Sequence, residues 1–163
     1  MSFIQERLKT SLEGGDPQKI IRDFIFAKGN AKLGDSFVNF IYSLAKSGVT
    51  NSTTGTKVSD LILSHAYRSS LWIKTDYLKL KGKKGQVADL VEALVLFFWI
   101  QNLISIDTYV ACLMESLNPD KLHHPREEEE TAIIAFKSIL DMCYSAWDKI
   151  VQPRKMDSSP SPN

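Results

Sequence analysis

The sequence predicts an all-α protein with about seven helices, for three reasons. Apolar residues recur at the i, i+3, i+4 spacing of a helix in successive segments of the chain. Gly, Pro and Asx residues stand between those segments, where helices end and begin. The segments lack the strict apolar–polar alternation of a half-buried strand. The 163 residues are enough for one sizeable core, and we expect a single domain over residues 1–152.

The interruptions predict where each helix lies. Gly14 and Gly15 end the first helix, and Asp16 before Pro17 is a favourable cap and first-turn pair for the second. A loop rich in Ser and Thr precedes the fourth helix, and a break after residue 104 separates the fifth from the sixth. The expected helices span residues 3–13, 17–28, 31–47, 57–73, 87–104, 107–116 and 126–151.

The third expected helix has a clear amphipathic pattern. Phe37, Phe40, Ile41 and Leu44 follow the helical rule and are predicted to face the core. Gly34 lowers the helix propensity near its start by about 1 kcal/mol relative to Ala. It suggests either a close crossing with another helix or open access to the neighbouring Asp35.

Composition narrows the possible partners and compartments. A net charge of +1 gives the chain no general attraction to nucleic acid, so phosphate binding would need locally concentrated Lys and Arg. The longest apolar run, residues 93–100, is far short of the roughly 20 residues that span a bilayer. Charged residues interrupt the N-terminal segment, as they would not in a signal peptide. We therefore expect a cytoplasmic protein without a membrane segment and with reduced cysteines, and the Pro- and Ser-rich tail 153–163 is predicted to be disordered.

The fifth expected helix is apolar on almost every face, as is typical of a helix in the middle of a fold. Asp89 and Glu92 are the exceptions in its first half, and their i, i+3 spacing places both carboxylates on one face. Carboxylates in an apolar setting are tolerated when they are paired or bind a metal. Asp35, which begins the third helix, is the natural third member of such a set. Hard oxygen ligands favour Mg²⁺ or Mn²⁺.

A basic segment precedes the fifth helix, with Lys81, Lys83 and Lys84 among its residues. It is either a solvated loop or a phosphate-contacting loop beside the carboxylates. Together with Lys57, these lysines form the candidate RNA-contacting set.

Two motifs resemble the ribonuclease III family. Residues 33–36 read Leu-Gly-Asp-Ser, similar to the family's signature, and residues 88–94 read Ala-Asp-Leu-Val-Glu-Ala-Leu, similar to its second acidic motif. Their order and separation also fit, and the resemblance covers roughly residues 18–117, with the helix 126–151 as an addition. The lack of room for a double-stranded-RNA-binding domain resembles the compact Mini-III members.

The resemblance implies an endonuclease-like helical domain that acts as a homodimer on double-stranded or structured RNA. It implies that Asp35, Asp89 and Glu92 bind Mg²⁺ (or Mn²⁺) and are catalytic. The sequence departs from the family's pattern upstream of Asp35, where Lys28 and Ala31 occupy the places of two glutamates. The change at Ala31 removes one metal ligand, although Mini-III proteins also carry Ala there.

Four hypotheses about function stay open at this point. The first is a metal-dependent endoribonuclease, and the second is a non-catalytic member of the fold that binds structured RNA or a ribonucleoprotein. In the third, Asp89 and Glu92 only pair with lysines in a helical interaction protein. The fourth is an all-α nucleotide pyrophosphohydrolase that uses the acidic run 127–130. In the family-based hypotheses, the stretch 97–99 would face a second subunit.

Overall fold

The computed structural model describes residues 1–76, 78 and 83–152, and in these residues helices are the only regular elements, as the sequence predicts. The predicted disordered tail, 153–163, lies outside the described residues. The elements are α1 (Phe3–Leu8), α2 (Pro17–Phe26), α3 (Asn30–Thr50), α4 (Asp60–Ser69), the 3₁₀ helix η1 (Leu71–Lys74), α5 (Lys84–Ile100), α6 (Ile106–Ser116), the 3₁₀ helix η2 (Pro119–Lys121) and α7 (Pro125–Val151).

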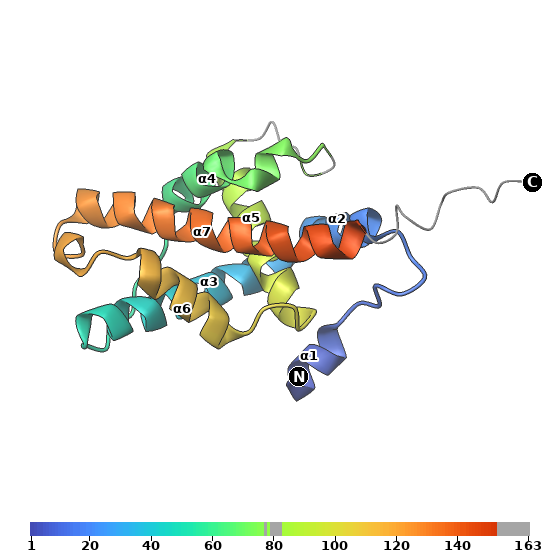
Figure 1. Cartoon of the computed structure of the whole chain (residues 1–163), viewed down its shortest axis with the longest axis horizontal. Helices are drawn as coiled ribbons and strands as arrows, with labels where there is room; N and C mark the ends of the chain where they lie inside the picture. The colour runs from blue at the N-terminus through green and yellow to red at the C-terminus, as the bar shows by residue number, and fades with distance from the viewer. Residues whose placement is uncertain (77, 79–82, 153–163) are drawn as a thin grey trace, which may run out of the picture.

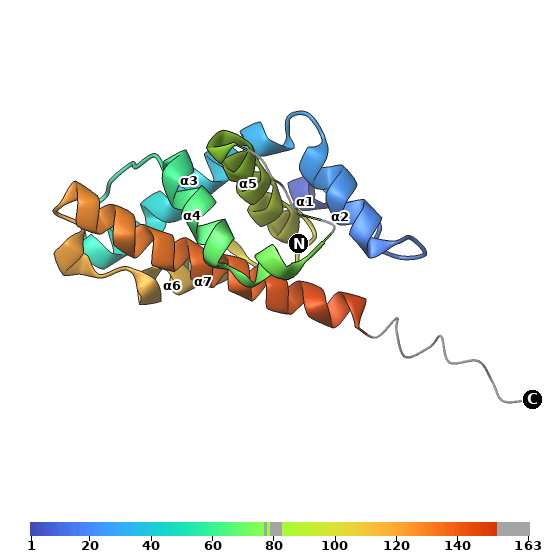
Figure 2. The ribbon, with the colours of Figure 1, turned by 90° about the horizontal axis from the view of Figure 1, so that it is seen from above.

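The helix α5 is the centre of the fold. It contacts α1, α2, α3, α4 and α7, and its most extensive contact is with α3. The long helix α7 runs across the molecule and packs on α4 and α6 (Figure 1). Seen from above, α5 lies inside the molecule between α4 and α2 (Figure 2). This position explains why α5 is apolar around its circumference.

An aromatic cluster fills the core around the end of α5. Phe97 packs edge-on against Phe24 of α2 and Trp147 of α7, with ring centroids 5.2 and 6.1 Å apart. Phe98 makes a similar contact with Trp72 of η1 at 6.1 Å. These contacts join α2, η1 and α7 through α5, so one core holds the domain together. None of the described helices is both long enough and apolar enough to cross a membrane.

The structure corrects several predicted helix boundaries. The first helix, expected over 3–13, ends at Leu8, and the third, expected over 31–47, continues to Thr50. The helix expected over 57–73 begins only at Asp60, because the Ser59 hydroxyl caps it by accepting a hydrogen bond from the Ile62 N–H. Residues 57–59 therefore belong to the segment before α4. The helix expected over 87–104 ends at Ile100, and Asn102 follows with a left-handed φ of 56° that a helix cannot contain.

Two predictions of burial were wrong. Phe40 and Leu44 of α3 are 51% and 40% exposed, although Phe37 and Ile41 are buried as expected. The stretch 97–99 was expected to face a second subunit, but Phe97 and Phe98 are fully buried in their own chain and Trp99 is half-buried.

Candidate active site

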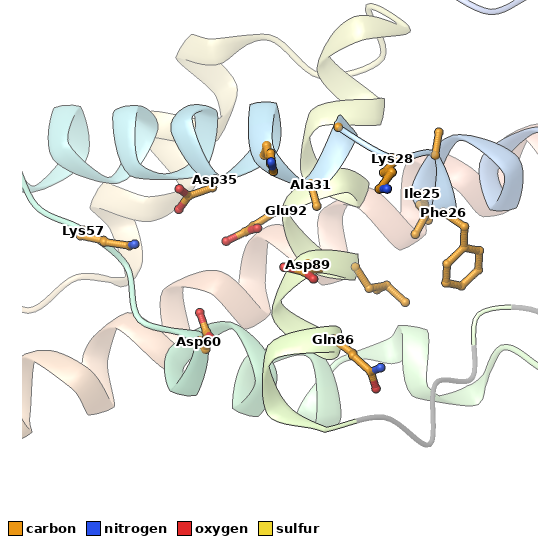
Figure 3. Close-up of a pocket in the computed structure, with 14 residues that line it drawn as sticks. Ile25, Phe26, Lys28, Ala31, Asp35, Lys57, Asp60, Gln86, Asp89 and Glu92 are labelled. Atoms are coloured by element: carbon orange, nitrogen blue, oxygen red, sulfur yellow. The ribbon is translucent and has the colours of Figure 1, made fainter.

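A pocket of about 820 Å³ opens where the start of α3, the start of α4 and the first half of α5 meet. Four carboxylates line it: Asp35 of α3, Asp60 of α4, and Asp89 and Glu92 of α5. Figure 3 shows their side chains turned toward a common space. The structure thus brings together the three carboxylates that the sequence singled out, although more than 50 residues separate Asp35 from Asp89 along the chain.

The crossing of α3 and α5 places these acids side by side. A Cβ atom at Gly34 would lie 2.4 Å from the backbone carbonyl oxygen of Glu92, closer than any side chain could approach. Gly34 therefore marks the helix crossing that was one of its two predicted roles. Asp35 follows Gly34 in α3, and Glu92 is the residue of α5 that Gly34 contacts. The close crossing therefore also sets how near the Asp35 carboxylate lies to the acids of α5.

Glu92 lies nearly buried at the wall of the pocket. It is 7% exposed, and its pKa is raised from 4.5 to about 8. Burial is the largest cause, followed by the negative charges of Asp35, Asp89 and Asp60, while Lys57 acts in the opposite direction. A carboxyl group in this setting keeps its proton at neutral pH until a cation arrives nearby.

Asn39 fixes the orientation of Asp35. Its side-chain amide donates a hydrogen bond to Asp35 Oδ1 at 2.9 Å, and its own Oδ1 accepts one from the Val58 N–H at 2.8 Å. The amide thus links a pocket carboxylate to the chain segment that precedes α4. No local sequence pattern indicates this role of Asn39, because its partner at Val58 is distant in sequence.

The candidate RNA-contacting lysines are divided between the pocket and the surface. Lys57 lines the pocket, whereas Lys83 and Lys84 are exposed at the start of α5 and do not line it. Lys81 lies outside the described residues.

The sequence did not predict three other charged residues of the pocket. Lys28 and Lys32 line it near the start of α3, and Asp60 contributes the fourth acid. An acid in the first turn of a helix is explained by the helix dipole, so Asp60 carried no separate signal.

The donors fit a hard divalent cation in chemistry. Carboxylate oxygens are the ligands that Mg²⁺ and Mn²⁺ prefer, and the pKa of Glu92 is raised first by burial and then by the neighbouring carboxylates, both of which a bound cation would counteract. In the described residues no group of three His, Cys, Asp or Glu side chains stands at metal-binding spacing. Side-chain rotation of Asp35, Asp89 and Glu92 within the pocket would therefore have to accompany binding.

The sequence model of the ribonuclease III family matches residues 28–148. The chain belongs to this family. The matched region contains all four pocket carboxylates and extends through most of α7, so the family domain includes the C-terminal helix. No similar sequence was found among curated proteins.

Within the ribonuclease III domain, the departures from the family signature fall in the pocket itself. Lys28 and Ala31, which the resemblance aligns with the two upstream glutamates, both line it. Ala31 stands one helical turn before Asp35, so a methyl group replaces an acid on the same face of α3.

Proposed function

We propose that the protein is a divalent-metal-dependent endoribonuclease that hydrolyses phosphodiesters in double-stranded or structured RNA. The observation that carries this proposal is the meeting of Asp35, Asp89 and Glu92 in one pocket of a ribonuclease III domain. The three acids come from two separate motifs, and the α3–α5 crossing at Gly34 is what joins them.

Each acid has a definable part in this activity. Asp35, Asp89 and Glu92 would hold Mg²⁺ or Mn²⁺, which when bound activates water and stabilises negative charge on a phosphate. Glu92 has to release its proton to act as a ligand, so cation binding becomes tighter as the pH rises toward about 8. Asn39 holds the Asp35 carboxylate in place through its amide.

Positive charge around the pocket supports an RNA substrate. Lys28, Lys32 and Lys57 line the same opening as the carboxylates, where a phosphate backbone would approach. Lys83 and Lys84 extend the basic surface along the start of α5. An A-form duplex is recognised by shape, by phosphates and by 2′-hydroxyl groups, for which lysines are suitable partners.

We also propose a homodimer that works in the cytoplasm. Leu33, Phe40 and Leu44 lie on one face of α3 and are all exposed, which suits a subunit contact better than contact with water. This face replaces the stretch 97–99 as the proposed contact. The free cysteines Cys112 and Cys143 agree with a reducing compartment.

Cleavage of a duplex RNA in the presence of Mg²⁺ or Mn²⁺ tests the proposed activity. We expect Asp35→Asn and Asp89→Asn to reduce the cleavage rate by at least about 10³-fold with the fold retained in circular dichroism. Asp107→Asn, at an exposed position of α6, is the matched control and should cleave like the wild type. Absence of cleavage with either metal on every duplex tried would contradict the proposal.

A non-catalytic RNA-binding role is the second candidate, and Ala31 is the observation that favours it, because it shortens the set of acids. Duplex binding that persists in Asp35→Asn, without cleavage by the wild type, would establish that role instead.

A further inference from the structure

Two serines of α3 hold the segment before α4 in an extended conformation. The Ser47 hydroxyl accepts a hydrogen bond from the Thr54 N–H at 2.9 Å and donates to the Thr54 carbonyl at 3.3 Å. The Ser43 hydroxyl makes the same pair of bonds with Thr56, at 2.9 and 3.2 Å. Because Ser43 and Ser47 are four residues apart, they lie on one face of α3 and bind alternate residues of the segment.

Asn39 continues this series by one more helical turn. Its Oδ1 accepts the Val58 N–H, so the backbone is fixed on both sides of Lys57. The same amide donates to Asp35, which places the lysine segment in register with the carboxylate site. The position of Lys57 is therefore determined by α3 and does not depend on a freely moving loop.

The Lys57 side chain extends into the pocket. Figure 3 shows its ammonium group directed toward the space between Asp35 and Asp60. It forms no ion pair with any carboxylate of the described residues, so its charge is available to a ligand of the pocket. The backbone hydrogen bonds fix where this exposed side chain begins, and its ammonium group can bind a phosphate oxygen as a point charge.

The α3 wall of the pocket lacks one acid. Ala31 presents a methyl group where a carboxylate one turn before Asp35 would add a ligand for a second cation. Lys57 adds a positive charge to the same space, and a second divalent ion would be repelled by it. Asp60 adds an acid from α4, but the α3 wall offers Asp35 without a second carboxylate one turn earlier, and the positive charge of Lys57 lies beside it, so the site favours a single bound metal.

We propose that Lys57 is a built-in cation of the site: it binds a phosphate oxygen of the RNA beside one divalent ion, and the site holds no second ion. This inference rests on the proposed function, because it assumes an RNA phosphate in the pocket. It assigns Lys57 to substrate binding and the three acids to the metal.

Counting bound Mn²⁺ tests the metal part of the inference. Titration of the full chain, followed by calorimetry and by the electron paramagnetic resonance signal of free Mn²⁺, should give one ion per chain. Lys57→Ala should still bind one ion, with equal or higher affinity because a repulsive charge has been removed. Two ions per wild-type chain, or none, would overturn the inference.

Affinity for a short RNA duplex in Ca²⁺ tests the role of Lys57 itself. We expect Lys57→Ala to weaken binding about tenfold, Lys57→Arg to restore most of it, and Lys149→Ala, on the exposed last turn of α7, to have no effect. A lysine that only balanced the acids would leave duplex affinity unchanged in Lys57→Ala, which would overturn the inference.

These measurements separate the two proposals. Cleavage by a wild-type chain that binds two ions would overturn the role of Lys57 and leave the endoribonuclease intact. One bound ion and Lys57-dependent duplex affinity without any cleavage would support the role of Lys57 and overturn the proposed hydrolysis.

Discussion

The two halves of α5 lie in very different surroundings. In the second half, Phe97 and Phe98 are fully buried and contact aromatic rings from α2, η1 and α7. In the first half, Asp89 is exposed, and Glu92 is nearly buried beside a pocket that contains three other carboxylates.

The difference lies in how burial is compensated. At Phe97, the contacts of neighbouring rings stabilise the buried side chain. At Glu92, burial and the neighbouring charges of Asp35, Asp89 and Asp60 raise the pKa to about 8, and the positive charge of Lys57 offsets only part of this rise. Glu92 is therefore most stable here with its proton or with a cation beside it, and a strongly shifted pKa in a pocket is typical of a functional site.

The largest expected effect is a loss of stability from a change in the second half of α5. Phe97→Ala should lower the free energy of unfolding by about 3–5 kcal/mol, because it removes a ring that joins α2 to α7. Urea denaturation measures this change. Leu103→Ala, at a 37%-exposed leucine just after α5, is the control and should cost less than about 1 kcal/mol. Equal losses for the two variants would contradict the assignment of Phe97 to the core.

The next largest effect is a change of stability with pH, and it arises from Glu92 in the first half of α5. The folded protein keeps a proton on Glu92 up to a pKa of about 8, whereas the unfolded chain loses it near 4.5. Between these values the folded state binds more protons, so the stability of the metal-free wild type should fall as the pH rises. The contribution of this group is at most about 1.4 kcal/mol per pH unit.

Glu92→Gln removes this contribution. In EDTA, its free energy of unfolding should change less with pH and should exceed that of the wild type at pH 8, because the buried charge is gone. Urea denaturation across the pH range measures both effects. Glu115→Gln, at an exposed position of α6, should follow the wild type. Parallel curves for wild type and Glu92→Gln would show that Glu92 is ionised without cost.

The sequence predicted those residues of the candidate site that local patterns reveal. The apolar run around Asp89 and Glu92 marked α5 as central, and the two motifs identified Asp35 as the third acid. Gly34 indicated a close crossing before its partner at Glu92 was known. In each case the signal lay within one helix turn of the residue concerned.

The remaining features of the site and fold depend on contacts between segments that are distant in the sequence. Lys57 was assigned to a helix, but its position comes from α3 hydrogen bonds that no local pattern reveals. Likewise, the periodicity of α3 placed Phe40 and Leu44 on its apolar face. It did not show that α5 and α6 cover only part of that face and leave these two residues exposed. Local pattern defines which face is apolar, but which neighbour covers that face is a property of the whole fold.

The smallest expected effect concerns the hydrogen bonds that join α3 to the segment before α4 at the edge of the pocket. Asn39→Ala removes two hydrogen bonds, one to Asp35 and one to the segment at Val58, and should cost about 1–2 kcal/mol of stability. Ser43→Ala is the matched variant, because it also removes two bonds to the same segment but none to a carboxylate. The two should be similarly destabilised in urea.

Mn²⁺ affinity then distinguishes the two variants. Asn39→Ala should bind Mn²⁺ several-fold more weakly, on the order of a lost outer-shell hydrogen bond, because Asp35 is free to rotate away from the pocket. Ser43→Ala should retain wild-type affinity, since Asp35 stays fixed. If both variants lost affinity equally, the 54–58 segment as a whole, and not the orientation of Asp35, would be what prepares the site for its cation.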